Sequence, residues 1–358
     1  MLTGHRLLAG LLVLHGLGCQ KPRRPATDAY VWNRRWTGAV REAVAQRPSE
    51  LRALRVLLGE TAQVKPEVSW VEVDGSSLLR GPVVAVLRVN GALPDEATWR
   101  AFLARIEALR QAGVDVPQLE VDYDSPVDAL GDYAQWLEAT GDSTPLARSV
   151  TALPAWAVSP EARRLAQSVD EVVLQVHTVR APVLFDVAAA VRDVRQWAEH
   201  TDRPFRVALP AYRARLASGE DLAAMPSDVA GAMKALAAEA LVTGFVFFRL
   251  GNADDRQAWS LPTLRSVLTG GTLEAKVQVR LEAIDPGGRD VWLENPGPID
   301  ALAPAEVAIG GALDEAIATT GYQRLEHRFV TSHPVWLRPG EHLRVGTVRG
   351  RNLYVLPE

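Results

Sequence analysis

Eight segments rich in β-branched residues alternate with alanine-rich amphipathic segments over about 240 residues of the chain. A repeat of strand then helix on this scale predicts a (β/α)8 barrel of the TIM type, which typically takes about 250 residues. We expect the barrel to cover residues 29–271. The expected strands are residues 30–36, 51–59, 83–90, 118–124, 148–153, 171–177, 205–209 and 243–250.

The helical segments between these strands differ in clarity. Residues 96–111 place five large apolar side chains at helical spacing: Trp99, Phe102, Leu103, Ile106 and Leu109. Residues 62–80 show no clear helix, so we expect an insertion or an irregular turn there. A doubly wound open sheet is the alternative fold, but no glycine-rich phosphate loop follows the first strand.

The pattern changes after Gly271. Residues 275–282 alternate apolar and polar side chains, which is typical of a half-buried strand. Asp285-Pro286-Gly287-Gly288 then forms a turn signal before the next apolar run. We therefore expect a small antiparallel β domain over residues 272–358.

The N-terminus has the layout of an export signal. A short basic segment precedes an apolar run, and small residues end at Gly18-Cys19. The apolar run is shorter than the roughly 20 residues that span a membrane. Cys19, the only cysteine of the chain, stands where the bacterial lipoprotein signal carries its lipid, although Gly16 replaces the usual branched residue. We expect a signal peptide over 1–18, a flexible tether over 19–28, and a lipoprotein anchored in the cell envelope, on the periplasmic or outer-membrane face. The alternative is an ordinary secreted protein with a chance cysteine.

Charge and motif content exclude some partners. The net charge is −4, and the basic residues are nearly all arginine. No basic run is interleaved with aromatic residues, so we expect no nucleic-acid partner. No HExxH motif or paired-histidine spacing is present, and carboxylates alone would suit only Mg²⁺ or Ca²⁺. We therefore predict no cofactor and no metal.

Three acidic side chains share one face of the expected fourth strand. Glu120, Asp122 and Asp124 alternate with Leu119, Val121 and Tyr123, so the acids point into the barrel if the apolar face packs under helices. Three acids this close in a partly dry interior predict a raised pKa for at least one of them. Asp124 ends the strand, where barrel active sites are built. The alternative is a structural network in which these acids pair with Arg88 or Arg249.

Further polar and aromatic residues occur near the ends of other expected strands. Glu60 is a possible second carboxylate beside Asp124. The candidate ligand-binding residues are Trp32, Arg34, Arg88, Asn90, Trp156, Gln175, His177, Tyr212 and Arg249. Aromatic rings beside carboxylates and amides suit sugars, whose C–H faces stack on aromatic rings. Each residue alone is a weak signal, because a single Trp is usually core and a single His is more often structural than catalytic.

Several of these strings resemble an uncharacterised bacterial family of exported proteins, a domain of unknown function. The strings are Tyr30-Val31-Trp32-Asn33-Arg34-Arg35-Trp36, Leu119-Glu120-Val121-Asp122-Tyr123-Asp124-Ser125-Pro126, Thr151-Ala152-Leu153-Pro154-Ala155-Trp156, Leu174-Gln175-Val176-His177 and Phe205-Arg206-Val207-Ala208-Leu209-Pro210. The resemblance covers most of residues 29–250 and implies a family without an activity.

The fourth strand also resembles, more loosely, that of chitinase-type glycoside hydrolases, which carry a D-x-D-x-E run. Glu120, Asp122 and Asp124 stand for these three acids, and Asp124, one methylene shorter, replaces the catalytic glutamate. The resemblance implies a glycoside-hydrolase-like barrel that acts on or binds a polysaccharide, with Asp124 as general acid and Asp122 as electrostatic partner or nucleophile. The alternative is a non-catalytic envelope lipoprotein that binds glycan or a protein partner.

Overall fold

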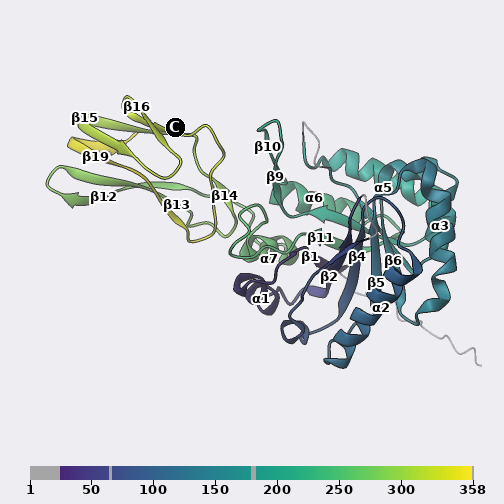
Figure 1. The fold of residues 1–358 in the computed structure, drawn as a ribbon. Helices are drawn as coiled ribbons and strands as arrows, with labels where there is room; N and C mark the ends of the chain where they lie inside the picture. The colour runs from purple at the N-terminus through teal and green to yellow at the C-terminus, as the bar shows by residue number, and fades with distance from the viewer. Residues whose placement is uncertain (1–24, 64–66, 179–182, 357–358) are drawn as a thin grey trace, which may run out of the picture.

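The computed structural model describes residues 25–63, 67–178 and 183–356. Eight parallel strands form a closed barrel in the order β1, β11, β8, β7, β6, β5, β4, β2, and β2 pairs back with β1 (Figure 1). The barrel strands are β1 (Ala26–Val31), β2 (Leu51–Thr61), β4 (Val83–Val89), β5 (Gln118–Tyr123), β6 (Ala147–Ala152), β7 (Glu171–Gln175), β8 (Phe205–Pro210) and β11 (Val242–Phe248). The predicted TIM-type barrel is confirmed.

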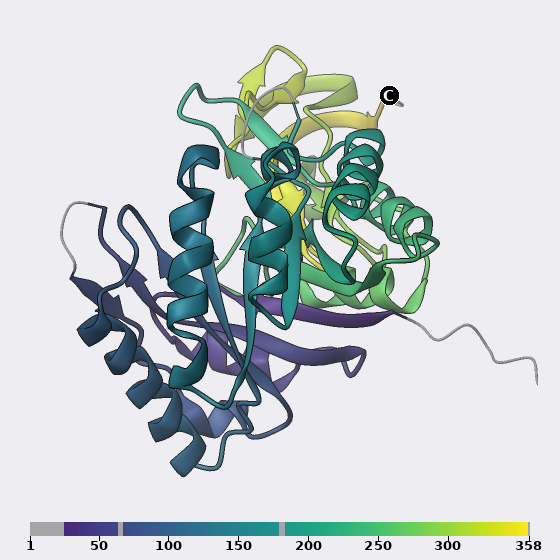
Figure 2. The same ribbon diagram turned by 90° about the vertical axis from the view of Figure 1, so that its right-hand side faces the viewer.

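Helices between the strands cover the outside of the barrel (Figure 2). They are α1 (Gly38–Ala45), α2 (Glu96–Gln111), α3 (Leu130–Ala139), α4 (Glu161–Gln167), α5 (Val187–Thr201), α6 (Pro226–Leu236) and α7 (Leu261–Thr269), with the short 3-10 turns η1 (Gly75–Leu78), η2 (Val127–Ala129), η3 (Gly141–Ser143) and η4 (Pro154–Val158). The helix predicted over 96–111 is α2, which begins after Asp95, whose side chain accepts a hydrogen bond from the Thr98 amide at 2.8 Å.

The main apolar core lies between the helices and the outer face of the barrel. Leu119, Val121 and Tyr123 belong to it, so the alternation on β5 has the predicted direction. A closed barrel buries the apolar side chains of its strands, and Val31, Val121, Val150, Val176, Val207 and Phe247 are buried. The acids of β5 therefore point into the barrel.

Seven of the expected strands differ from the observed ones by one or two residues at an end, so that Asp124, His177 and Arg249 follow their strands, and the largest differences are at the first strand and in the second unit. The first strand starts at Ala26 and ends at Val31, so Trp32 and Arg34 lie in the loop that follows it. The unclear second unit contains the short strand β3 (Val68–Trp70), antiparallel to β2, and η1 in place of a full helix. The irregular connection predicted there is thus present.

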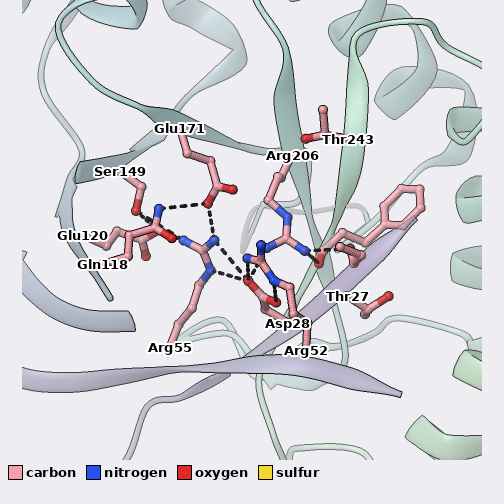
Figure 3. Close-up of polar contacts among 12 residues, drawn as sticks. Thr27, Asp28, Arg52, Arg55, Gln118, Glu120, Ser149, Glu171, Arg206 and Thr243 are labelled. Atoms are coloured by element: carbon pink, nitrogen blue, oxygen red, sulfur yellow. Dashed lines mark hydrogen bonds and ion pairs between the residues drawn. The ribbon is translucent and has the colours of Figure 1, made fainter. Parts of the chain in front are cut away.

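The inside of the barrel is layered along its axis. Opposite charges fill the end where the strands begin, and Arg55 lies at their centre (Figure 3). An apolar layer of Tyr30, Val86, Val173, Ala208 and Val246 follows. The third layer, at the carboxyl ends of the strands, is polar and open. We call the first layer the charged base and the third layer the mouth.

Arg55 connects the charged base across the barrel. Its guanidinium donates to Asp28 at 3.2 Å and contacts the carboxylates of Glu120 and Glu171. Asp28 also accepts from Arg52 at 2.9 Å and contacts Arg206. Three carboxyl groups and three guanidinium groups thus pair in one cluster, so acidic and basic side chains are equal in number.

A glycine makes room for this cluster. A Cβ atom on Gly244 of β11 would lie 2.2 Å from the Ala26 carbonyl oxygen and 2.9 Å from a nitrogen of Arg206. The missing side chain therefore allows β1 to approach β11 and the Arg206 guanidinium to lie against the strand.

The second sheet is antiparallel, as predicted, with the order β12, β13, β19, β15, β17, β16. Its strands are β12 (Gln278–Asp285), β13 (Gly288–Glu294), β15 (Glu306–Ala318), β16 (Gln323–Leu325), β17 (Arg328–Val330) and β19 (His342–Val355). Two short antiparallel pairs lie outside it, β9 (Arg213–Arg215) with β10 (Asp221–Ala223), and β14 (Ala301–Leu302) with β18 (Trp336–Leu337). The C-terminal region that contains this sheet has its own apolar core around Val291, Phe329 and Val345.

Candidate functional site

A cavity of about 920 Å³ occupies the mouth of the barrel. Barrel enzymes build their active sites at this end, from the residues that follow the strands. Of the candidate residues, Trp32, Arg34, Glu60, Arg88, Asn90, Asp122, Asp124, Gln175, His177 and Tyr212 line it. The structure therefore brings together most of the side chains that the strand ends indicated.

Asp122 near the end of β5 and Asp124, the first residue after the strand, face this cavity and share one arginine. Arg88 of β4 donates to an Asp122 oxygen at 2.8 Å and to an Asp124 oxygen at 2.7 Å. The Thr151 hydroxyl donates to the other Asp122 oxygen at 2.6 Å. The Asp122 side chain is 6% exposed, whereas 45% of the Asp124 side chain is exposed. Asp124 is therefore the acid that a ligand can reach.

The buried position of Asp122 changes its pKa. Burial raises the pKa of Asp122, and the neighbouring charge of Asp124 adds to the increase, while Arg88 opposes it. The raised pKa expected for at least one acid is present at Asp122. Arg88 keeps its charge, since burial lowers its pKa less than the two carboxylates raise it.

Glu60, at the end of β2, is held by an arginine. Arg34 donates to both Glu60 carboxylate oxygens, at 2.7 and 2.9 Å, and the Asn90 amide donates to one of them at 3.2 Å. The hydrogen bond from Arg34 lowers the pKa of Glu60. Glu60 is thus an ionised member of the wall with both oxygens occupied.

Aromatic rings form one side of the mouth. The Trp32 ring packs edge-on against Tyr30 and Phe248, with ring centres 5.6 and 5.4 Å apart. The Tyr212 ring also packs edge-on against Phe248, with ring centres 5.6 Å apart. These contacts hold the rings in place, so a flat ligand would meet a preformed surface.

His177 completes this side of the cavity. Its ring stacks on Phe248, and its Nδ1 lies 3.5 Å from the Tyr212 hydroxyl. Its Nε2 is buried and has no hydrogen-bond partner among the described residues. Burial lowers the pKa of His177 to about 4, so the imidazole is neutral at ordinary pH.

The placement of Glu120 corrects the prediction of a catalytic role. Its side chain has no exposed surface and contacts Arg55 in the charged base, away from the mouth. Burial raises the pKa of Glu120, and Arg55 opposes that shift. The residue lies two positions before Asp122, which is roughly 7 Å deeper along the strand. Glu120 is therefore a structural member of the cluster.

Trp156 and Arg249 also lie outside the mouth. Trp156 is fully buried in the core, where its indole N–H donates to the Ser125 carbonyl at 2.9 Å, so it presents no surface to a ligand. Arg249 turns to Asp255, with a nitrogen–oxygen distance of 2.7 Å, and lines a neighbouring cavity. Neither residue contributes to the mouth as predicted.

Some lining residues escaped the sequence reasoning. Phe248 faces the cavity, and the alternation on β11 carries the signal that could have identified it. Phe185, Asp186 and Asp193 come from the loop before α5 and from the helix itself. No strand periodicity applies there, so their position was not readable.

Two further properties concern the described residues only. They hold no group of three or more His, Cys, Asp or Glu side chains placed to bind a metal ion. No helix among them combines the length and apolar character that crossing a membrane requires.

Residues 80–254 match the family model of a domain of unknown function, DUF3142. The match runs from β4 through β11 and includes Asp122 and Asp124, and the family resemblance seen in the sequence is confirmed there. Residues of the loop after β1, such as Trp32, precede it.

Solved structures similar to the chain include glycoside-hydrolase-type barrels. The spore cortex-lytic enzyme SleL of Bacillus cereus is 13% identical, with a TM-score of 0.47 over 71% of this chain and 76% of that one. The GH18 chitinase ChiB of Flavobacterium johnsoniae is 9% identical, with a TM-score of 0.46 over 69% and 95%. A putative alpha-L-fucosidase from Bacteroides thetaiotaomicron is 9% identical, with a TM-score of 0.42 over 74% and 97%. No curated protein matches the sequence. The barrel assignment itself follows from the strand pairing.

Proposed function

We propose that the mouth binds a polysaccharide and that Asp124 acts as the general acid in its hydrolysis. The observation that carries the proposal is the position of Asp124. Its half-exposed carboxylate lies in the wall of a cavity that also presents the rings of Trp32 and Tyr212. Aromatic faces stack on the C–H faces of sugar rings, and the polar groups beside them can bind hydroxyls.

The surroundings of Asp124 suit this role. Asp122 is buried next to it and linked to it through Arg88, so it can act as the electrostatic partner of the reacting group. Asp124 would protonate the glycosidic oxygen as the C–O bond breaks, a water molecule would add to the anomeric carbon, and the carboxylate of Asp124 would take back the proton that this water releases. Glu60 is less suited as the second carboxylate, because Arg34 already occupies both of its oxygens.

Arg88 also supports a second candidate, a non-catalytic glycan-binding barrel. It pairs with both Asp122 and Asp124, so the two acids already have a structural partner. In that case the mouth would bind sugar and leave the glycosidic bond intact.

The decisive experiment measures binding and turnover together. The probes are β-1,4-linked oligomers of N-acetylglucosamine, suggested by the resemblance of β5 to chitinase-type strands, and oligomers of glucose. Asp124→Asn keeps the shape of the side chain but cannot deliver a proton, so turnover should fall by about 10²–10⁴-fold while binding persists. Asp128→Asn makes the same change on an exposed acid of η2, outside the mouth, and should leave both unchanged.

The other outcomes separate the candidates. Binding by the wild type without turnover would favour the non-catalytic barrel. Equal turnover by the wild type and Asp124→Asn would remove the acid from the mechanism. A wild type that binds none of these oligomers would overturn the sugar proposal.

We further propose that the protein is an exported lipoprotein held at the cell envelope through Cys19. Residue 19 lies outside the described residues, so the proposal rests on the order of basic, apolar and small residues before it. Cys19→Ser should move the protein into the soluble fraction or leave an uncleaved precursor, as judged by membrane fractionation and intact mass. Unchanged membrane partitioning of the variant would exclude the lipid anchor.

A further inference from the structure

A second cavity, of about 410 Å³, adjoins the mouth. It lies between the loop after β1 and the loop after β11, two strands that pair in the barrel. Its lining residues are Trp32, Asn33, Arg34, Arg35, Thr37, Val40, Arg249, Asn252, Asp254 and Asp255. Trp32 and Arg34 line both cavities, so the two spaces meet across these side chains.

The second cavity is a built surface. Asn252 is buried, and its side-chain oxygen accepts from the amides of Asp254 and Asp255 at 3.0 and 3.2 Å, which fixes the loop. The Thr37 hydroxyl donates to Asp254 at 3.0 Å, and this contact joins the two loops. Carboxylates, guanidinium groups and amides therefore converge on a small space, as they do in sites that bind polyhydroxylated ligands.

The C-terminal region holds one wall of this cavity. Arg338 donates to the backbone carbonyls of Asn252, Ala253 and Asp255, at 2.9, 3.1 and 2.8 Å. Arg256, the next residue of the same loop, pairs with Glu341 at 2.8 Å. Arg338 and Glu341, both outside the barrel, therefore hold the loop after β11 in place.

We propose that the second cavity is a further subsite for the same glycan, so that the ligand is an oligomer lying across Trp32, and that Arg338 is a positioning residue for this subsite. The inference rests on the proposed function, because it takes the ligand of the mouth to be a sugar chain. Trp32 is suited to contact a ligand in both cavities, because it lines both of them. Its contacts with Tyr30 and Phe248 hold the ring in this position. A single sugar would leave the second cavity unused.

The test compares a short and a long probe by calorimetric titration. The probes are the disaccharide and the hexasaccharide of N-acetylglucosamine, and the matching pair made of glucose. The wild type should bind the hexasaccharide about tenfold or more tightly than the disaccharide, the gain expected from one or two added hydrogen bonds. Arg35→Ala, which shortens an exposed side chain of the second cavity, should remove most of this preference and leave the disaccharide affinity unchanged.

Arg338→Met tests the positioning role. Arg338 lines neither cavity, and its replacement removes three hydrogen bonds to the loop after β11. The variant should bind the hexasaccharide more weakly and the disaccharide as tightly as the wild type does. Arg338→Lys, which cannot make the same forked contacts, should restore little of the hexasaccharide affinity. Arg265→Ala, an exposed arginine of α7 outside both cavities, should leave binding of both probes unchanged.

The outcomes distinguish this inference from the proposed function. If the wild type binds disaccharide and hexasaccharide equally well, the second subsite is overturned and the sugar-binding mouth stands. If Arg35→Ala and Arg338→Met weaken both probes alike, the second cavity is not separate and the inference fails. If the wild type binds no probe, the proposed function is overturned, and this inference with it.

Discussion

The two ends of the barrel contain the same kinds of charged side chain in opposite surroundings. In the charged base, Asp28, Glu120 and Glu171 pair with Arg52, Arg55 and Arg206, and Arg55 has no exposed surface (Figure 3). At the mouth, Glu60, Asp122 and Asp124 pair with two arginines, and Asp124 remains half exposed. The surroundings of an acid, more than its residue type, therefore decide whether it stabilises the fold or can contact a ligand.

The charged base needs its pairing because it is dry. Burial alone would raise the pKa of Asp28, but the guanidinium groups of Arg55 and Arg206 hold it below its ordinary value. A carboxylate with a lowered pKa stabilises the fold above its unfolded pKa, and this stability is lost as the pH falls through the folded pKa. The base is therefore a closed structural unit, separated from the mouth by the apolar layer around Tyr30.

The largest expected effect breaks this unit. Asp28→Asn leaves the buried guanidinium groups of Arg55 and Arg206 without their shared carboxylate, so the free energy of unfolding should fall by about 3–5 kcal/mol. Urea denaturation measures this loss. Asp128→Asn, on an exposed acid, should change stability by no more than about 0.5 kcal/mol.

A milder variant covers the case in which Asp28→Asn fails to fold. Arg52 is half exposed and forms a bidentate pair with Asp28, so Arg52→Met should lower stability by a smaller but measurable amount. If neither change lowers the free energy of unfolding, the charged base is solvated. The charged base and the mouth would then not differ in their access to water.

The sequence predicted the fold better than it predicted depth along the barrel axis. Strand–helix alternation gave the barrel, and the period of two gave the correct face of β5. Both signals repeat along a strand, so neither says which layer a residue occupies. Glu120 and Asp122 share a face, yet one lies in the base and the other at the mouth.

Residues outside regular strands were harder to place. Trp156 follows β6 in a 3-10 turn, where side chains no longer alternate, and the turn directs the ring into the core. Trp32 also follows its strand, but its loop leaves the ring partly exposed at the mouth. The difference arises from loop geometry, which depends on tertiary contacts that one sequence does not display.

A smaller effect should separate binding from folding at the mouth. Trp32→Ala removes a ring shared by both cavities, so glycan affinity should fall by about 10–30-fold, a common result for truncation of a central Trp. Calorimetric titration with the hexasaccharide measures the loss. Trp292→Ala, a partly buried Trp of β13 outside both cavities, should leave affinity unchanged. Equal losses from the two changes would show that the effect is not local to the mouth.

The smallest effect is a pH dependence at His177. The ordinary pKa of histidine is 6.5, and burial lowers that of His177 to about 4 in the folded chain. Between these values the unfolded chain binds a proton that the folded chain does not, so this residue makes the fold less stable as the pH falls from 6.5 towards 4. The loss should reach about 1 kcal/mol at pH 5, allowing for partial exposure of the ring.

Comparing variants isolates this contribution from other groups that titrate in the same range. His177→Gln cannot take up the proton, so its stability should fall less than that of the wild type between pH 7 and pH 5. His200→Gln, at an exposed position near the end of α5, should follow the wild-type curve. If His177→Gln also follows that curve, the imidazole is solvated. Water from the mouth would then reach the His177 ring, although this ring stacks on Phe248. The aromatic side of the mouth would in that case be more hydrated than the ring packing indicates.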